Sequence, residues 1–191
     1  MTLQRSIVLV GLMGAGKTSV GRKLADALAV QFVDSDDEVV AAAHMTIPEI
    51  FESYGEAEFR RLERAVIARL MRDDPVVLST GGGAFIQPEI RDIVAESGVR
   101  VWLSADIDVL WSRVADKPGR PLLEAPNPYQ TFCALADARN PIYATSDLTV
   151  QSSRQESQED VAERVIASLK ELDRRAGGND IFLDRQRVQD G

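Results

Sequence analysis

Residues 11–18 read GLMGAGKT, which fits the phosphate-loop pattern G-x-x-x-x-G-K-[ST] in full. The apolar run SIVLV at residues 6–10 predicts a buried strand directly before the loop, and residues 16–29 predict an amphipathic helix after it. The glycines allow backbone N–H groups to surround a phosphate, and the helix N-terminus adds partial positive charge. This context disfavours a chance glycine-rich turn, so the stretch predicts a nucleoside triphosphate site.

Two side chains of the loop have roles that follow from phosphate chemistry. The Lys17 ammonium can reach the β- and γ-phosphates, and the Thr18 hydroxyl can bind Mg²⁺. The metal's acidic partner is not at its usual place, because the hydrophobic run at residues 76–78 ends in Ser79 rather than aspartate. The guanine-specificity pattern N-K-x-D is absent, which disfavours a signalling GTPase.

Short β-branched runs alternate with helical stretches along the rest of the chain. Further strands are predicted at residues 31–34, 75–79, 99–103 and 147–150. Continuous apolar runs of this kind are typical of strands covered on both faces, as in a parallel sheet. Helices are predicted after the capping box at Thr46, at 56–72, from Pro88, from Pro128 and at 157–174. The alternation predicts a doubly wound α/β fold.

The composition limits the classes of function. The 191 residues are 45% hydrophobic and 27% charged, which is ordinary for one globular domain, and we place that domain at residues 1–176. The formal charge of −8 disfavours nucleic acid and anionic membranes as partners. A single cysteine, Cys133, excludes an internal disulfide, and no apolar stretch reaches the ~20 residues of a membrane span. We expect a cytoplasmic monomer.

Two segments differ from this pattern. Residues 115–126, ADKPGRPLLEAP, hold three prolines and one glycine between two predicted helices, which predicts a mobile loop. Residues 177–191 are mostly polar after a Gly-Gly pair, which predicts a disordered, frayed C-terminal tail despite the apolar residues 181–183.

Two carboxylates follow the strand predicted at residues 31–34. Asp34 and Asp36 are two residues apart, so both can project into a crevice at the carboxyl end of the strand if the chain stays extended. One could hold a metal through water, and the other could take a proton from a substrate hydroxyl. The alternative is a solvated helix N-terminus, where aspartate is common. These residues alone leave both interpretations open.

Several blocks together resemble the shikimate kinase family, in that family's order and at its approximate spacing. After the phosphate loop these blocks are FVDSDDEV at 32–39, GEAEFRRLE at 55–63, STGGG at 79–83, GRPLL at 119–123 and RNPIY at 139–143. The phosphate loop is shared by many families, whereas the combination is far more discriminating. The resemblance covers about residues 5–170.

The resemblance implies a P-loop kinase fold, similar to that of nucleoside monophosphate kinases. It implies a mostly parallel five-stranded sheet flanked by helices, with a lid loop at about residues 115–126 that closes over ATP. The implied reaction transfers the γ-phosphoryl group of ATP to the 3-hydroxyl of shikimate, with Mg²⁺ as cofactor, and ATP and shikimate are the implied partners.

Carried over residue by residue, the resemblance also implies a site. The implied catalytic residues are Lys17, Asp36 and the lid residue Arg120. The implied ATP-binding residues are Gly14, Ala15, Gly16, Lys17, Thr18, Ser19, Arg113, Arg120 and Arg154. The implied shikimate-binding residues are Asp36, Arg60, Gly81, Gly82, Gly83 and Arg139. The implied residues at the metal are Thr18 and Asp34.

Elementary chemistry supports these roles. A carboxylate substrate suits the planar fork of Arg60 and Arg139, although without the resemblance both arginines read as solvated helix residues. Glu63, three residues after Arg60 on the same helical face, could orient that guanidinium. The glycines at 81–83 are costly in entropy, and close approach to a ligand is a sufficient reason for them.

Two other functions compete with this interpretation. A kinase for another polyol acid, such as gluconate, would also use a phosphate loop and acceptor arginines. A nucleotide-binding regulatory module without turnover would keep the loop but need not keep Lys17, Thr18, Asp34 and Asp36 together. A coupled ATPase assay with and without shikimate separates the three.

Overall fold

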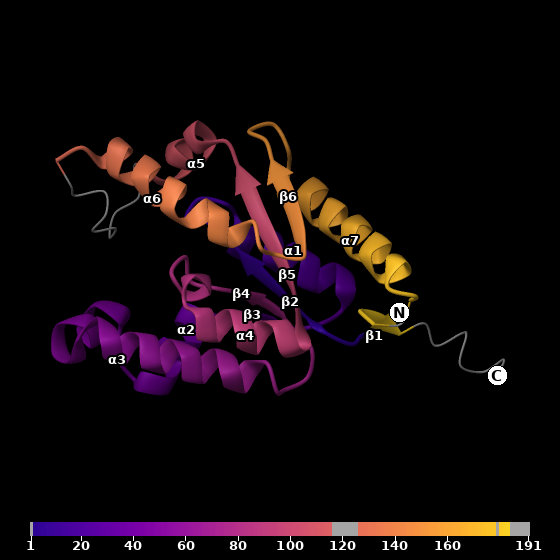
Figure 1. Cartoon of the computed structure of the whole chain (residues 1–191), viewed down its shortest axis with the longest axis horizontal. Helices are drawn as coiled ribbons and strands as arrows, with labels where there is room; N and C mark the ends of the chain where they lie inside the picture. Colours follow the sequence, from indigo (N-terminus) through magenta and orange to yellow (C-terminus); the bar gives the residue numbers. More distant parts are fainter. Residues whose placement is uncertain (1, 116–125, 179, 184–191) are drawn as a thin grey trace.

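The computed structural model of the chain describes residues 2–115, 126–178 and 180–183. Its centre is a five-stranded parallel sheet with the strand order β3-β4-β2-β5-β6 (Figure 1). The strands are β2 (Ser6–Val10), β3 (Phe32–Asp34), β4 (Val77–Ser79), β5 (Gly98–Ala105) and β6 (Leu148–Ser152). The predicted α/β sheet is therefore confirmed, with its five strands close to the predicted positions.

Helices flank the sheet. They are α1 (Lys17–Leu28), α2 (Ser35–Ala43), α3 (Ile47–Leu70), α4 (Pro88–Ser97), α5 (Ile107–Val114), α6 (Pro128–Tyr143) and α7 (Gln158–Arg175), with a 3₁₀ turn η1 (Ala84–Ile86). Helices α1 and α7 pack together, and α3 packs on α4; in Figure 1, α7 lies beside β6 while α3 and α4 lie together away from it. No helix in the described part of the chain has the length and apolar character that crossing a membrane requires.

The apolar run at residues 6–10 forms β2, the central strand of the sheet. All residues of β2 are buried, because β4 and β5 pair with its two edges and helices cover its faces. Its carboxyl end leads directly into the phosphate loop. Because the sheet is parallel, the carboxyl ends of β3, β4 and β6 lie at the same edge, where ligands bind in open α/β sheets.

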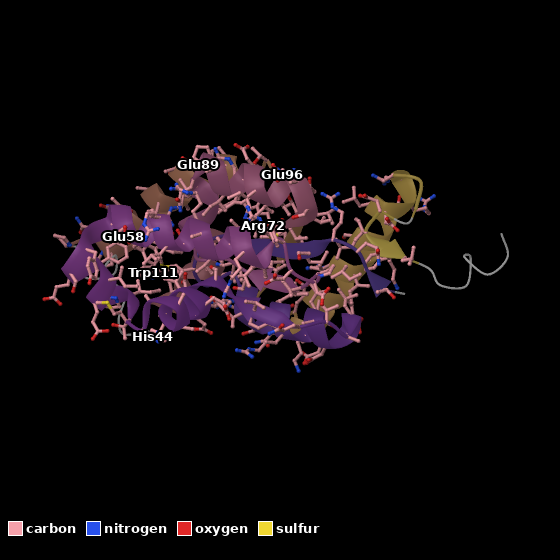
Figure 2. All side chains as sticks on the ribbon, turned by 90° about the horizontal axis from the view of Figure 1, so that it is seen from below. His44, Glu58, Arg72, Glu89, Glu96 and Trp111 are labelled. Atoms are coloured by element: carbon pink, nitrogen blue, oxygen red, sulfur yellow. The ribbon has the colours of Figure 1, made fainter. Side chains whose placement is uncertain are left out.

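Helix α4 shows how the flanking helices divide their faces. Ile90 and Val94 are fully buried against the sheet side. Glu89 and Glu96 are exposed and lie along the outer surface of the helix (Figure 2). This apolar stripe opposite a charged face is what the 3.6-residue period requires, and it leaves negative charge on the exterior.

The structure corrects the prediction of a frayed tail over its first residues. Strand β7 (Phe182–Leu183) pairs antiparallel with β1 (Thr2–Leu3), and Ile181 and Phe182 are buried. The carboxylate of Asp173 accepts hydrogen bonds from two backbone N–H groups of this segment, at 2.9 and 2.7 Å. The apolar residues 181–183 have partners far away in sequence, so local composition could not reveal them. Residues 179 and 184–191 lie outside the described part.

Candidate active site

A cleft of about 870 Å³ lies at the carboxyl edge of the sheet. It is lined by the phosphate loop, by the ends of β3, β4 and β6, and by residues of α5, α6 and the start of α7. The sequence-predicted residues that line it are Gly14, Ala15, Gly16, Lys17, Thr18, Ser19, Asp34, Asp36, Gly81, Gly82, Gly83, Arg113, Arg139 and Arg154. Arg60 lies directly behind Gly83, and Arg120 is outside the described residues.

The phosphate loop has a conformation that its glycines make possible. Gly14 has a φ of 83°, and a Cβ atom there would lie 2.8 Å from the carbonyl oxygen of Leu110. Gly16 takes the N-cap position of α1 without a side-chain cap, so the first N–H groups of the helix are left to the loop and its ligand. The Lys17 ammonium donates to the carbonyl oxygens of Gly11 and Leu12, at 2.8 and 3.1 Å, and so curls over the loop.

Asp34 and Thr18 meet at the bottom of the cleft. The Thr18 hydroxyl donates to Asp34 Oδ2 at 3.2 Å, while Asp34 Oδ1 accepts from the backbone N–H of Asp36 at 3.1 Å. Among the residues described, no group of three histidine, cysteine or acidic side chains could hold a metal. Mg²⁺ commonly uses one or two protein ligands, with water and phosphate oxygens completing its shell. This pair of hard oxygen donors beside the loop fits that requirement.

The sequence left Asp36 as either a carboxylate in a ligand crevice or part of a solvated helix N-terminus, and the structure agrees with each interpretation in part. It lies in the first turn of α2, capped by Asp34, so the chain is helical here rather than extended. It is nevertheless not a solvated helix residue, because Asp36 Oδ1 is buried and has no hydrogen-bond partner among the described residues. Burial raises the pKa of the Asp36 carboxyl, as does the nearby Asp34, while Lys17 and Arg60 oppose the rise. Such an unpaired acceptor is expected to await a donor from a ligand.

Arg60 is fixed by carboxylates of its own helix. Its Nη1 donates to Glu63 Oε2 at 2.8 Å, and its Nε and Nη2 donate to Glu56 Oε1 at 3.3 and 3.2 Å. Glu63 is only 1% exposed, and its Oε2 also accepts from the Gln87 amide at 2.7 Å. Burial raises the pKa of the Glu63 carboxyl, while Arg60 opposes that rise. The Arg60–Glu63 contact was predicted; Gln87 was not, because nothing in its neighbourhood of the sequence signals it.

The glycine turn at residues 81–83 brings together the residues predicted to bind the acceptor. A Cβ atom at Gly81 would lie 2.6 Å from Asp36 Oδ1 and 3.1 Å from Glu63 Oε1, so both carboxylates abut its Cα. The carbonyl oxygen of Gly82 accepts from Arg139 Nη1 at 3.0 Å. Side chains from α2, α3 and α6 therefore converge on one backbone turn that has no side chains of its own.

Two further predicted arginines within the described residues line the cleft. Arg113 Nη1 donates to the carbonyl oxygen of Gly14 at 3.2 Å, and its Nη2 donates to that of Ser153 at 3.1 Å. Arg154 is exposed and lines the cleft beside the start of α7. Sequence reasoning missed the α7 residues Gln158 and Val161, which also line the cleft, because no local pattern marks a helix start as part of a site.

Comparison with known proteins decides the family. The profile of the family described as shikimate kinase matches residues 13–170. The chain belongs to the shikimate kinase family. Shikimate kinase of Ruegeria pomeroyi is 54% identical over 167 residues, which is 87% of this chain and 86% of the relative. Shikimate kinase of Mesorhizobium japonicum is 51% identical over 165 residues, 86% of this chain and 81% of the relative.

Solved structures agree with this assignment. Shikimate kinase from Acinetobacter baumannii, in complex with shikimate, superposes with a TM-score of 0.82 at 37% identity, covering 87% of this chain and 93% of that one. A gluconokinase from Sinorhizobium meliloti 1021 has a TM-score of 0.63 at 17% identity, covering 92% and 97% of the chains, so that likeness is one of fold. The predicted resemblance to shikimate kinase and the P-loop kinase fold are confirmed, whereas the residue roles stay predictions.

The glycine turn of this shikimate kinase family member offers a graded test. We expect Gly81→Ala and Gly83→Ala to weaken shikimate binding by up to about 100-fold, since displacing Asp36 or Arg60 loses a charge-assisted hydrogen bond to the substrate, worth roughly 1.5–3 kcal/mol. The new methyl groups would press on Asp36 and, at 2.7 Å, on Arg60 Nη2. Gly82→Ala separates a clash inside the protein from a clash with the substrate, because its Cβ would meet its nearest protein neighbour, Arg139 Nη1, at an ordinary 3.6 Å. Calorimetric titration with shikimate measures all three, and equal affinities would contradict the prediction.

Proposed function

We propose that this chain transfers the γ-phosphoryl group of ATP to the 3-hydroxyl of shikimate, giving shikimate 3-phosphate and ADP. One observation carries the proposal: a complete phosphate loop and a buried, unpaired carboxylate lie in the same cleft, and two guanidiniums lie at the glycine turn that this carboxylate contacts. A phosphate loop alone would fit any nucleotide enzyme, whereas the acceptor end requires a ligand that has both hydroxyl groups and an anionic group.

The acceptor end is proposed to hold shikimate with cationic side chains at its carboxylate and an anionic side chain at its hydroxyl. Arg60 and Arg139 bind the substrate carboxylate, for which the planar fork of arginine is suited. Asp36 Oδ1 accepts the hydrogen bond of the 3-hydroxyl and takes its proton as the new P–O bond forms. The raised pKa of Asp36, caused first by its burial, suits a group that must receive a proton. The backbone of residues 81–83 lines the ring.

The nucleotide end is proposed to hold ATP by backbone N–H groups and cations. Residues 14–19 surround the phosphates, and Lys17 binds the oxygens of the β- and γ-phosphates. Arg113 and Arg154 lie beside the adenine base. Arg120 is proposed to meet the transferred phosphoryl group and help exclude water. Thr18 and Asp34 would hold Mg²⁺, which neutralises negative charge on the phosphates when it is bound. We further propose that the chain works as a cytoplasmic monomer.

A gluconate-type kinase is the second candidate, and the shared fold with a gluconokinase favours keeping it in the test. A coupled ADP-release assay with shikimate, with gluconate and with neither separates the possibilities. Turnover that depends on shikimate supports the proposal. Turnover with gluconate alone contradicts the acceptor assignment, and no stimulation by either acid contradicts the kinase assignment.

The carboxylate-binding arginines give a quantitative prediction. Charge-assisted hydrogen bonds are worth roughly 1.5–3 kcal/mol, so Arg60→Ala and Arg139→Ala should each weaken shikimate by about one to two decades. ATP affinity should stay near that of the parent protein. Arg61→Ala is the matched control, because Arg61 is exposed on the same helix and pairs with Glu58 at 2.6 Å. Titration calorimetry with shikimate and with a non-hydrolysable ATP analogue checks all variants; unchanged shikimate affinity in both test variants would move the acceptor site elsewhere.

A further inference from the structure

Tyr143 ends the RNPIY block, and neither sequence reasoning nor the proposed mechanism gives it a role. It is the last residue of α6 and is 1% exposed. Its hydroxyl donates to the carbonyl oxygen of Gly82 at 2.5 Å. A buried side chain from a distant helix thus reaches the middle of the turn on which the acceptor residues converge.

Arg139 donates to the same oxygen. Its Nη1 lies 3.0 Å from the Gly82 carbonyl oxygen, so the two donors fill both lone pairs of that atom. The two side chains are four residues apart on α6, which places them on one face of the helix. The guanidinium also contacts the Tyr143 hydroxyl, but it has five N–H donors, so donors remain for a substrate carboxylate.

The Tyr143 ring cannot swing away from this position. It stacks on Phe85 at 6.5 Å between ring centroids, with 20° between the ring planes, and lies 6.2 Å from the Trp102 ring. Burial raises the pKa of the Tyr143 hydroxyl, which keeps it protonated and able to donate near neutral pH. The carbonyl of Gly82 is therefore pinned toward α6 by a rigid donor.

Pinning this carbonyl fixes more than one atom. A trans peptide is planar, so the N–H of Gly83 points opposite to the carbonyl of Gly82, away from α6. The backbone of Gly83 in turn lies against Arg60, whose Nη2 would be 2.7 Å from a Cβ atom there. One hydroxyl thus sets the plane of a peptide that touches one acceptor arginine on each side.

We infer that Tyr143 is a positioning residue of the acceptor site. By holding the Gly82 carbonyl, it keeps the glycine turn in register and leaves the Arg139 guanidinium open to the substrate carboxylate. Without its hydroxyl, Arg139 is the remaining donor to that carbonyl within the described part of the chain, and the carbonyl competes with the substrate for the guanidinium. The inference rests on the proposed use of Arg139 and the turn for shikimate.

Tyr143→Phe tests the inference, because it removes one hydroxyl and keeps the stacked ring. We expect the KM and the Kd for shikimate to rise by about three- to tenfold, the worth of one hydrogen bond, with kcat within about twofold and the KM for ATP unchanged. Tyr129→Phe is the matched control on the same helix, since its hydroxyl donates to Asp108 at 2.7 Å and it does not line the cleft. A merely structural tyrosine would lower the melting temperature and leave the shikimate constants unchanged, and that result would overturn the inference.

A second measurement separates this inference from the proposed function. Backbone NMR signals of Gly82 and Gly83 should shift in Tyr143→Phe and not in Tyr129→Phe, whether or not shikimate is present. If those signals shift but the parent protein does not turn over shikimate, the proposed function fails while the pinned turn stands. With an active parent protein, Tyr143→Phe and Arg139→Lys should combine non-additively on shikimate affinity. Additive effects would show that the two donors act separately, and that outcome would refute the coupling.

Discussion

Lys17→Met is expected to abolish phosphoryl transfer while the protein stays folded. The ammonium sits over the phosphate loop, bound to the carbonyl oxygens of Gly11 and Leu12, and faces the cleft rather than the core. Methionine has a similar length and no charge, so it fills the space without stabilising phosphate oxygens. Loss of one preorganised donor to a developing charge costs about 10²–10³ in kcat, and removal of a full charge should reach at least that.

A matched variant isolates the role of the charge. Lys23→Met also removes an ammonium from α1, but that group pairs with Glu159 at 2.7 Å on the outside of the protein. Steady-state kinetics and circular dichroism should show normal turnover for Lys23→Met, and a folded but inactive protein for Lys17→Met. Near-normal kcat in Lys17→Met would mean that the loop is not where the reaction occurs.

Asp36→Asn is expected to lower turnover far more than it weakens shikimate. The amide keeps the shape of the side chain and can accept a hydrogen bond, but it cannot take the hydroxyl proton. General-base contributions are typically 10²–10⁴-fold, and kcat should fall within that range. Burial raises the pKa of Asp36, so the parent protein should lose kcat/KM as the pH falls through a value above the ordinary ~3.9, because the protonated carboxyl cannot act as a base.

The pH profile makes this prediction specific. The residual activity of Asp36→Asn should lack the acidic limb of the kcat/KM profile, whereas Asp37→Asn, which alters the exposed neighbour, should keep both the limb and the turnover. A variant at Asp36 with unchanged kcat, or with the same acidic limb as the parent protein, would assign the proton to another acceptor.

The sequence predicted those features that are written in consecutive residues. The phosphate loop and the buried β2 run could be recognised because a glycine pattern and an unbroken apolar stretch are local signals. The pairing of Arg60 with Glu63 was predictable for the same reason, since three residues along a helix always share a face.

Features that depend on tertiary packing were not predictable. Gln87, the N-cap residue of α4, donates its amide to Glu63 of α3, and the burial of Ile181 depends on β1 and Asp173, which lie beside it. The conformation at Asp36 was left open, since an aspartate pair can begin a helix or extend a strand. The chain is helical at Asp36, yet the carboxylate is buried in the site because the neighbouring glycine turn covers it.

The strand order has a consequence for altering this protein by design. In the proposed function, the segments that follow β3 and β4 carry the acceptor residues, central β2 leads into the phosphate loop, and β5 and β6 lead to the arginines proposed to bind ATP. The sheet thus separates the recognition of the two substrates into neighbouring modules. A library directed at positions 36–63 and 81–87 can therefore explore new acceptor molecules while the ATP half, including Asp34 beside Thr18, stays untouched. Helix α6 is the exception: it follows β5 in the chain, but its Arg139 contacts the glycine turn and belongs to the proposed acceptor site. Arg139 should therefore be varied together with the acceptor positions.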